Sequence, residues 1–153
     1  MTPNTTYPGI YVEQVPNGLR TISGVSTSIA AFVGASRTGR SNHPVRILSF
    51  GEFELRFGGL VSGLELGYSV RQFFLNGGSE AWVVRVARSV PVPKFVKAIH
   101  ALDAVDLLNL LVLPGITVPA VLAAAADYCL KRRAFLIVDA PQDAKTPVAM
   151  EQA

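Results

Sequence analysis

The sequence predicts an α/β fold in which a mostly parallel sheet is flanked by helices and preceded by an extended N-terminal β-arm. From residue 24 to residue 141, strand-like segments alternate with segments whose apolar residues recur at helical spacing. The inner strand-like segments are apolar on both faces, which is typical of parallel strands that helices cover on two sides. Ahead of them, residues 10–15 form a strand-like run with no hairpin partner beside it. A lone strand of this kind needs a sheet to join, in its own domain or in another subunit.

Composition limits the class of protein. The chain has 153 residues, half of them hydrophobic and only 16% charged, so we expect one domain whose excess apolar surface serves subunit interfaces. No apolar stretch approaches the ~20 residues that a spanning helix needs. The first residues lack the basic and apolar regions of a secretory signal. We therefore expect synthesis in the cytoplasm and no direct membrane insertion.

Three regions divide the chain. We predict that residues 1–23 are an extended N-terminal arm with its connector and that residues 24–141 are the α/β core domain. Residues 142–153 are polar and Ala-rich, which indicates a frayed tail or a truncated linker.

The first elements of the core domain are two strands and a helix. Residues 29–33 predict a buried strand that ends at Gly34, and residues 45–48 predict a short second strand. Ser49 and Glu52 then have the spacing of a capping box, in which each side chain satisfies a backbone donor of the other residue. The helix that they open is expected to end at the two glycines of positions 58 and 59.

The sequence pattern in the middle of the domain predicts a helix, a strand and a second helix, in that order. Residues 64–75 form a helical pattern that stops at residues 76–78, and residues 81–86 predict a strand. The apolar residues that we place near one face of the first helix are Leu64, Tyr68, Phe74 and Leu75. Further along, a weaker helical pattern rests on Phe95, Ile99 and Leu102, which recur at i, i+4 and i+7.

The last elements are a strand, a helix and a strand. Residues 107–113 form a near-continuous apolar strand. We expect Thr117 to cap a helix over residues 118–133, since a proline in its first turn is tolerated there. Residues 134–138 predict the final strand, which Asp139 closes as a turn residue that bonds nearby backbone amides.

The residues 34–41 match the spacing of a phosphate-binding P-loop, with Arg40 in place of lysine. A P-loop opens directly into a helix whose first amides hold the phosphates, whereas this loop leads into the strand at residues 45–48. Arginine is also a poor substitute for the compact lysine ammonium. We therefore interpret the segment as an ordinary loop, and nucleotide binding by an α/β enzyme remains the least favoured alternative.

Other chemistry has little support in the sequence. His43, His100 and Cys129 lie far apart along the chain, and no local metal-ligand spacing exists. Asp103 and Asp106 are paired carboxylates, which a solvated helix end or turn explains more simply than acid–base catalysis. We predict no catalytic residue, no cofactor and no metal, and we expect Cys129 to be a buried thiol.

Two basic groups raise the question of nucleic acid. The first consists of Arg37, Arg40, His43 and Arg46, and the second of residues 131–133. Neither group is interleaved with aromatic residues or placed in a known reading motif. With a net charge of only +3, we expect no nucleic-acid partner.

Several segments in a fixed order give the sequence a family resemblance. It resembles the N-terminal half of the contractile tail sheath proteins, which serve contractile-tailed phages, R-type pyocins and related extracellular injection particles. The segments that carry the resemblance are residues 7–15, 24–34, 53–59, 73–79, 81–86, 106–115 and 133–139.

The resemblance implies a mechanical role rather than an enzymatic one. Subunits of that family form stacked six-fold rings around an inner tube, extended arms join the sheets of neighbours, and contraction drives the tube into a target envelope. The expected partners are other sheath subunits, the inner tube protein and, in a divided sheath, a separate C-terminal chain. The particle would be a phage tail or an extracellular injection particle assembled from protein made in the bacterial cytoplasm. The residues expected to form the subunit-interaction arm are Tyr7, Pro8, Gly9, Ile10, Tyr11, Val12, Glu13, Gln14 and Val15.

The sequence departs from the family pattern in two places. Members often carry an outer domain after the strand that residues 81–86 resemble, and here only residues 87–101 bridge to the next motif. Members also continue well beyond the position of Asp139, with a C-terminal portion that receives arms. Alternative roles are therefore a sheath-associated capping or regulatory module and one chain of a two-chain sheath.

Overall fold

The computed structural model describes residues 28–141 and residue 146. A five-stranded sheet in the order β2-β3-β1-β4-β5 forms its centre. All neighbouring strands are parallel except β2, which runs antiparallel to β3. The predicted α/β fold with a mostly parallel sheet is confirmed, while the arm and most of the tail lie outside the described residues. The strands are β1 Ala30–Ala35, β2 Pro44–Ile47, β3 Ala81–Val86, β4 Leu110–Val112 and β5 Phe135–Ile137.

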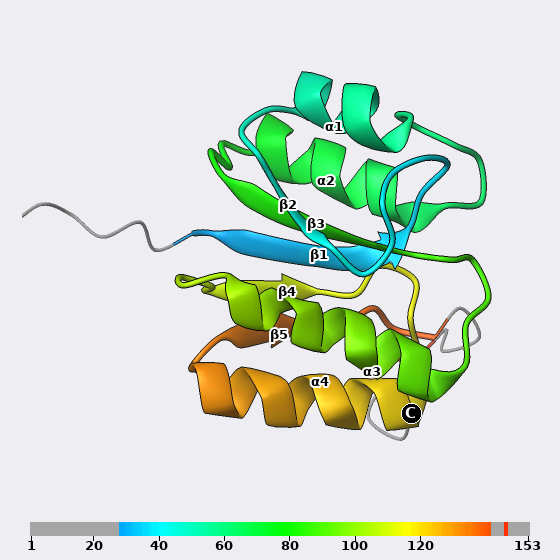
Figure 1. Ribbon diagram of the computed structural model, residues 1–153, viewed down its shortest axis with the longest axis vertical. Helices are drawn as coiled ribbons and strands as arrows, with labels where there is room; N and C mark the ends of the chain where they lie inside the picture. The colour runs from blue at the N-terminus through cyan, green and yellow to red at the C-terminus, as the bar shows by residue number, and fades with distance from the viewer. Residues whose placement is uncertain (1–27, 142–145, 147–153) are drawn as a thin grey trace, which may run out of the picture.

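Helices pack on both faces of this sheet (Figure 1). On one face lie α1 and α2, next to β2, β3 and β1, and on the other face lie α3 and α4. A short 3₁₀ turn, η1, continues α3. The bounds are α1 Phe50–Phe57, α2 Glu65–Leu75, α3 Val92–His100, η1 Ala101–Ala104 and α4 Pro119–Arg132.

The sheet separates two hydrophobic cores, and its central strand β1 contributes side chains to both. Its residues alternate between the faces of the sheet: Ala30 and Phe32 belong to the core under α1 and α2, whereas Ala31 and Val33 belong to the core under α3 and α4. Every one of these side chains is buried. The apolar character of the strand on both faces is therefore explained by a helical layer on each side.

The start of α1 follows the capping pattern with one difference. The Oγ of Ser49 accepts a hydrogen bond from the N–H of Glu52 at 3.3 Å, as predicted. The Glu52 carboxylate, however, accepts from the N–H of Leu48 at 3.1 Å, one residue earlier than the donor expected in a capping box. Gly58 ends the helix with a left-handed φ of 87°, as the sequence indicates.

The apolar face predicted for α2 is buried only in part. Phe74 packs half-buried against the core, whereas Tyr68 and Leu75 are exposed, and the fully buried positions of the helix are Leu66, Gly67 and Val70. A Cβ at Gly67 would lie 3.0 Å from the carbonyl oxygen of Gly59. Because Gly67 has no side chain, this turn of α2 can approach the backbone of Gly59 closely. The buried face of the helix is therefore centred on a glycine, which a pattern of apolar side chains does not reveal.

Three boundaries also differ from the prediction. Strand β4 is limited to Leu110–Val112, because Asn109 interrupts the apolar run and uses its side chain to accept a hydrogen bond from the N–H of Ile29 at 3.0 Å. Helix α4 begins after Val118 with no side-chain cap, so the predicted role of Thr117 is wrong. The last strand is the shorter β5.

Candidate interaction surface

The sheet has two edges, and β2 forms a protected one. It begins at Pro44, which has no N–H to offer a further strand. Arg46 then forms a two-pronged ion pair with Glu80, with both N–O distances at 2.8 Å. Hydrogen bonding to Arg46 lowers the pKa of the Glu80 carboxyl, with a further contribution from its charge. Charges and proline are the usual means of preventing unwanted strand pairing.

Strand β5 forms the other edge and lacks these features. Residues 135–138 include neither proline nor a charged residue. The exposed fractions are 68% for Phe135, 40% for Ile137 and 49% for Val138. Within the described part of the chain, β4 is the single strand that pairs with β5. An apolar strand with one open side is a typical site for strand addition.

A groove of about 650 Å³ runs beside this edge, between α2 and the strands β1, β4 and β5. Its floor is apolar and comes from β1, β4 and β5, while α2 supplies a polar wall. The floor residues are Phe32, Leu110, Val112 and Ile137, and the polar wall residues are Tyr68, Ser69, Gln72 and Asn76. Ser28 and Asp139 also line the groove.

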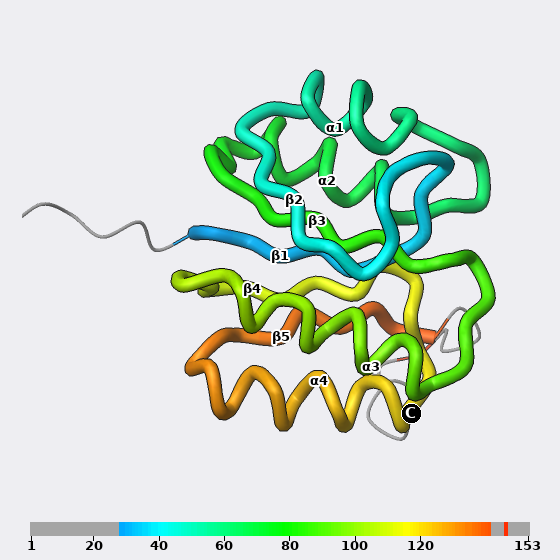
Figure 2. Tube along the Cα trace, in the orientation of Figure 1, coloured from blue at the N-terminus to red at the C-terminus, as the bar shows by residue number. Residues whose placement is uncertain are grey.

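The groove exists because the two faces of the sheet are covered unequally. Helix α4 packs beside β5 on one face, whereas on the other face α1 contacts β2 and α2 contacts β1, away from β5 (Figures 1 and 2). The side chains of Phe135 and Ile137 point to the same face because they are two positions apart in a strand. Their exposure therefore marks the part of the sheet that the helices of the described residues leave open.

Asp139, which lines the groove, forms a hydrogen bond with a distant backbone amide. Its Oδ2 accepts a hydrogen bond from the N–H of Gly115 at 2.7 Å, and Gly115 has a φ of 69° in the turn after β4. The prediction that Asp139 is a turn residue bonding nearby backbone amides is wrong, because its carboxylate accepts from an amide 24 positions away and residue 139 does not lie in a turn. This bond ties the end of β5 to the connection between β4 and α4.

In the loop with P-loop spacing, residues 34–41, two glycines lie in close contact with side chains of α1 and α2. A Cβ at Gly34 would lie 3.2 Å from the Cβ of Leu66, so this glycine allows α2 to approach β1. Gly39 has a φ of 109° and faces the ring of Phe57. The loop then leads into β2, as the sequence predicts, rather than into a helix.

Hydrogen bonds from β3 hold the same loop. The guanidinium of Arg85 donates to the carbonyl oxygen of Ser36 at 3.1 Å and to the Oγ of Ser41 at 2.8 Å. Arg40, which takes the place of the P-loop lysine, is exposed. These contacts account for the loop as a structural connection.

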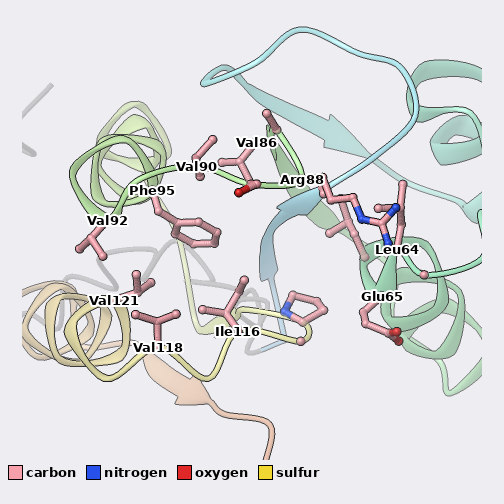
Figure 3. Close-up of a pocket in the computed structure, with 17 residues that line it drawn as sticks. Leu64, Glu65, Val86, Arg88, Val90, Val92, Phe95, Ile116, Val118 and Val121 are labelled. Carbon is pink, nitrogen blue, oxygen red and sulfur yellow. The ribbon is translucent and has the colours of Figure 1, made fainter. Parts of the chain in front are cut away.

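A second hollow, of about 350 Å³, lies at the carboxyl ends of β1, β3 and β4 (Figure 3). Ligands of open α/β sheets often bind at this place. Here the α3 and α4 side is apolar, with Phe95, Val118 and Val121, while the charged side chains Glu65 and Arg88 lie on the α2 side. Among its lining residues only these two are charged. The hollow therefore offers one guanidinium and one carboxylate, without a second acid or base facing either group.

The remaining titratable candidates are dispersed. His100 Nδ1 lies 3.4 Å from Asp103 Oδ2, and both side chains are more than half exposed. Cys129 is a buried free thiol, as predicted, and burial raises its pKa. Among residues 28–141 and 146, no group of three histidine, cysteine or acidic residues is placed to hold a metal ion. The same residues include no helix of the length and hydropathy that a membrane span requires.

The β5 surface was not among the predicted site residues. All of those residues belong to the arm, residues 7–15, which lies outside the described part of the chain. The sequence does contain a signal for the surface, since residues 134–138 remain apolar up to the end of the last strand. What it does not contain is the order of the strands, which decides that this strand is an edge.

Comparison with known proteins places the fold. No protein-family model matches the sequence, and no curated protein matches it at a significant level. The fold is similar to that of the helical sheath of the anti-feeding prophage in its contracted state, with a TM-score of 0.64 and 20% identity over 95% of this chain and 42% of that chain. It is also similar to the contracted sheath complex of the extracellular contractile injection system PVC, with a TM-score of 0.63 and 23% identity over 99% of this chain and 40% of that chain.

A third similar chain comes from the contracted baseplate of the anti-feeding prophage, with a TM-score of 0.61 and 19% identity over the whole of this chain and 43% of that chain. The present chain thus spans less than half the length of each sheath-type chain that it matches. The resemblance noted in the sequence is confirmed at the level of the fold, since these structural neighbours come from the contracted sheaths and baseplate of contractile injection systems.

Proposed function

We propose that the chain is a structural subunit of a contractile sheath, which polymerises around an inner tube and contracts to drive the tube into a target envelope. The observation that carries this proposal is the similarity of nearly the whole chain to contracted sheath structures. The apolar side chains that β5 exposes in the described part of the chain support it, because polymeric subunits need apolar surface for their contacts. In this role the chain acts through contacts with other subunits and the tube, without an enzymatic step or a cofactor.

The arm, residues 7–15, would link subunits by strand addition. Main-chain hydrogen bonds would give such a link its affinity, and alternate side chains would give it specificity. A link through an extended connector can survive large rotations of the domains that it joins, since the connector absorbs the change in direction. The arms would therefore keep the lattice continuous while the sheath shortens and widens.

A second candidate function is one chain of a divided sheath, or a capping or regulatory module on a sheath. The same similarity in fold supports it, since the neighbours come from contracted sheath and baseplate assemblies. A divided sheath would have a separate C-terminal chain as a further partner. The particle would again be a phage tail or an extracellular injection particle.

Electron microscopy and analytical sedimentation of the purified chain test the proposal. The chain should be studied alone, with an inner tube protein and with a separate C-terminal sheath chain. Rings, tubes or linked subunits are expected in at least one combination. A strict monomer in every combination would contradict the proposed function.

A variant of the arm tests its part in assembly. Val12→Pro removes one backbone donor and fixes φ, so assembly should weaken while the domain stays folded. The matched control is Val12→Thr, which keeps the N–H and a β-branched side chain. Circular dichroism monitors the fold and sedimentation monitors assembly; loss of the fold in the proline variant would mean that the arm belongs to its own core.

A further inference from the structure

We infer that the hollow at the carboxyl ends of β1, β3 and β4 binds a small zwitterion with an apolar side chain, which is the chemistry of a free apolar α-amino acid. Arg88 holds the carboxylate of this ligand, Glu65 holds its ammonium group, and the α3 and α4 side of the hollow takes its apolar side chain. A site for a small ligand is a further property of the chain and does not depend on the sheath role.

The connections between the strands create the hollow. After β1 the chain turns to the face of the sheet that α1 and α2 cover, whereas β3 leads to α3 and β4 leads to α4 on the other face (Figure 1). Where neighbouring strands send their connections to opposite faces, the chain diverges and leaves a crevice that often holds a ligand. The hollow lies at this point, with Ala35, Val86 and Pro114 among the residues that line it.

The size and the apolar wall of the hollow indicate the body of the ligand. Its volume of about 350 Å³ lies at the lower end of the roughly 300–1,000 Å³ that ligand pockets span, so one aromatic or branched side chain fills much of it. Phe95 and Val121 are buried in the wall, whereas Val118 is 46% exposed. Figure 3 shows these three residues on the side of the hollow opposite Glu65 and Arg88. An apolar group placed against the wall removes the exposed surface of Val118 from water.

The two charged side chains determine the polar part of the ligand. Within the described part of the chain, neither Arg88 nor Glu65 takes part in an ion pair. A simple carboxylate attracted to Arg88 is repelled by Glu65, and a simple amine attracted to Glu65 is repelled by Arg88. A zwitterion satisfies both charges at once. The planar guanidinium also suits a carboxylate, which it can bind through two parallel hydrogen bonds.

The starts of three helices add positive potential at the hollow. Helices α2, α3 and α4 begin at residues that line it, Leu64, Val92 and Val118, and none of the three has a side-chain cap. The N-terminus of a helix carries a partial positive charge, which favours an anionic group nearby. Glu65 offsets part of this charge at α2. The surroundings of Arg88 therefore favour the carboxylate end of the ligand.

A titration of the full 153-residue chain with four probes tests the site. The first probe is L-phenylalanine, and the other three each lack one of its features. N-acetyl-L-phenylalanine lacks the ammonium group, L-phenylalanine amide lacks the carboxylate, and glycine lacks the apolar side chain. Saturation-transfer NMR measures weak binding even when the chain assembles. L-phenylalanine should bind with a Kd on the order of 1 mM, and the other three should bind at least about tenfold more weakly.

Two variants should change the order of the probes in opposite ways. Arg88→Gln should weaken the binding of L-phenylalanine at least about tenfold, and it should improve the binding of L-phenylalanine amide because the repulsion of the ammonium group is removed. Glu65→Gln should also weaken L-phenylalanine, but it should improve N-acetyl-L-phenylalanine instead. The matched controls are Arg71→Gln and Glu54→Gln, which change exposed side chains that do not line the hollow and should leave all four Kd values unchanged. Circular dichroism establishes that each variant is folded.

A third variant tests the apolar wall. Val118→Ser removes the exposed apolar side chain and supplies a favourable N-cap for α4, which has none. The domain should therefore stay as stable as the unmodified chain in urea, while the Kd of L-phenylalanine rises at least about threefold. An unchanged Kd would mean that the ligand does not lie against the α4 side.

Three results would overturn the site. The first is no binding of L-phenylalanine, L-leucine or L-valine up to about 10 mM. The second is equal binding of all four probes, or equal binding by the Arg88→Gln and Glu65→Gln variants. The third is binding of N-acetyl-L-phenylalanine amide as tight as that of L-phenylalanine, which would indicate a peptide segment in place of a free zwitterion. None of these results bears on the sheath role, which microscopy and sedimentation test separately.

Discussion

Replacing Gly39 by alanine should destabilise the domain strongly, because this glycine has two reasons to lack a side chain. Its φ of 109° lies in a region that residues with a Cβ rarely adopt, at a cost of about 1–3 kcal/mol. A Cβ would also lie 2.8 Å from Cδ1 of Phe57, a ring that is 1% exposed and has no free space to move into. Overpacking of this kind costs about 1–3 kcal/mol. The free energy of unfolding should therefore fall by about 2–6 kcal/mol.

Urea unfolding followed by the fluorescence of Trp82, the single tryptophan, measures this change. With a slope of about 2 kcal/mol per molar urea, a loss of 3 kcal/mol lowers the midpoint by about 1.5 M. The control is Gly51→Ala in α1, where the nearest atom to a new Cβ is Ser49 Oγ at 3.9 Å; there alanine should raise stability by up to about 1 kcal/mol. Equal midpoints for the two variants would refute the packing account of the loop. Saturable binding of ATP with magnesium in a calorimetric titration, lost in Gly39→Ala, would support the P-loop interpretation instead.

Three further predictions concern stability and reactivity. The hydroxyl of Tyr128 is buried without a hydrogen-bond partner among the described residues. Burial, followed by the charge of Asp103, raises the pKa of Tyr128 to about 12. Because the folded chain keeps this hydroxyl protonated, the free energy of unfolding is unaffected below about pH 10 and falls by up to about 3 kcal/mol as the pH rises toward 12. Tyr128→Phe should show less of this alkaline loss in urea titrations at two pH values, and an equal loss would contradict the assignment. Ser49→Ala should cost about 1 kcal/mol in the same assay, because the N–H of Glu52 loses its acceptor; no change would mean that the cap contributes nothing. Cys129 should react slowly with a thiol reagent in the folded chain and rapidly in urea, since its thiol is buried and its pKa is raised; fast labelling of the folded protein would contradict its burial.

Local signals in the sequence were sufficient for most of the fold. Turn glycines and apolar runs located the five strands within a few residues, and the spacing of Phe95, Ile99 and Leu102 identified the buried face of α3 and η1. Ser49 marked the start of α1 because a cap is a contact between residues three positions apart. Each of these features depends on neighbours in the chain.

Features that depend on distant contacts were harder to predict. The buried face of α2 is centred on Gly67, whose importance lies in its approach to Gly59 rather than in its own hydrophobicity. The shortening of β4 depends on the bond between Asn109 and Ile29, 80 positions apart. The candidate site has the same origin, because only the strand order makes β5 an edge. The role assigned to the arm stays a prediction that the Val12→Pro variant tests.

The position of β1 determines how the domain would bear a mechanical load. The described chain begins at Ser28, and β1 follows at once in the interior of the sheet, paired with β3 over six residues and with β4 over three. A pull on residue 28 along the strand axis would shear both sets of hydrogen bonds at the same time, whereas a pull on an edge strand would open one set bond by bond. Gly34 brings α2 close against the same strand, so that helix resists its displacement as well. Tension on the N-terminal connector would thus be spread over two strands and a helix before any part of the sheet separates.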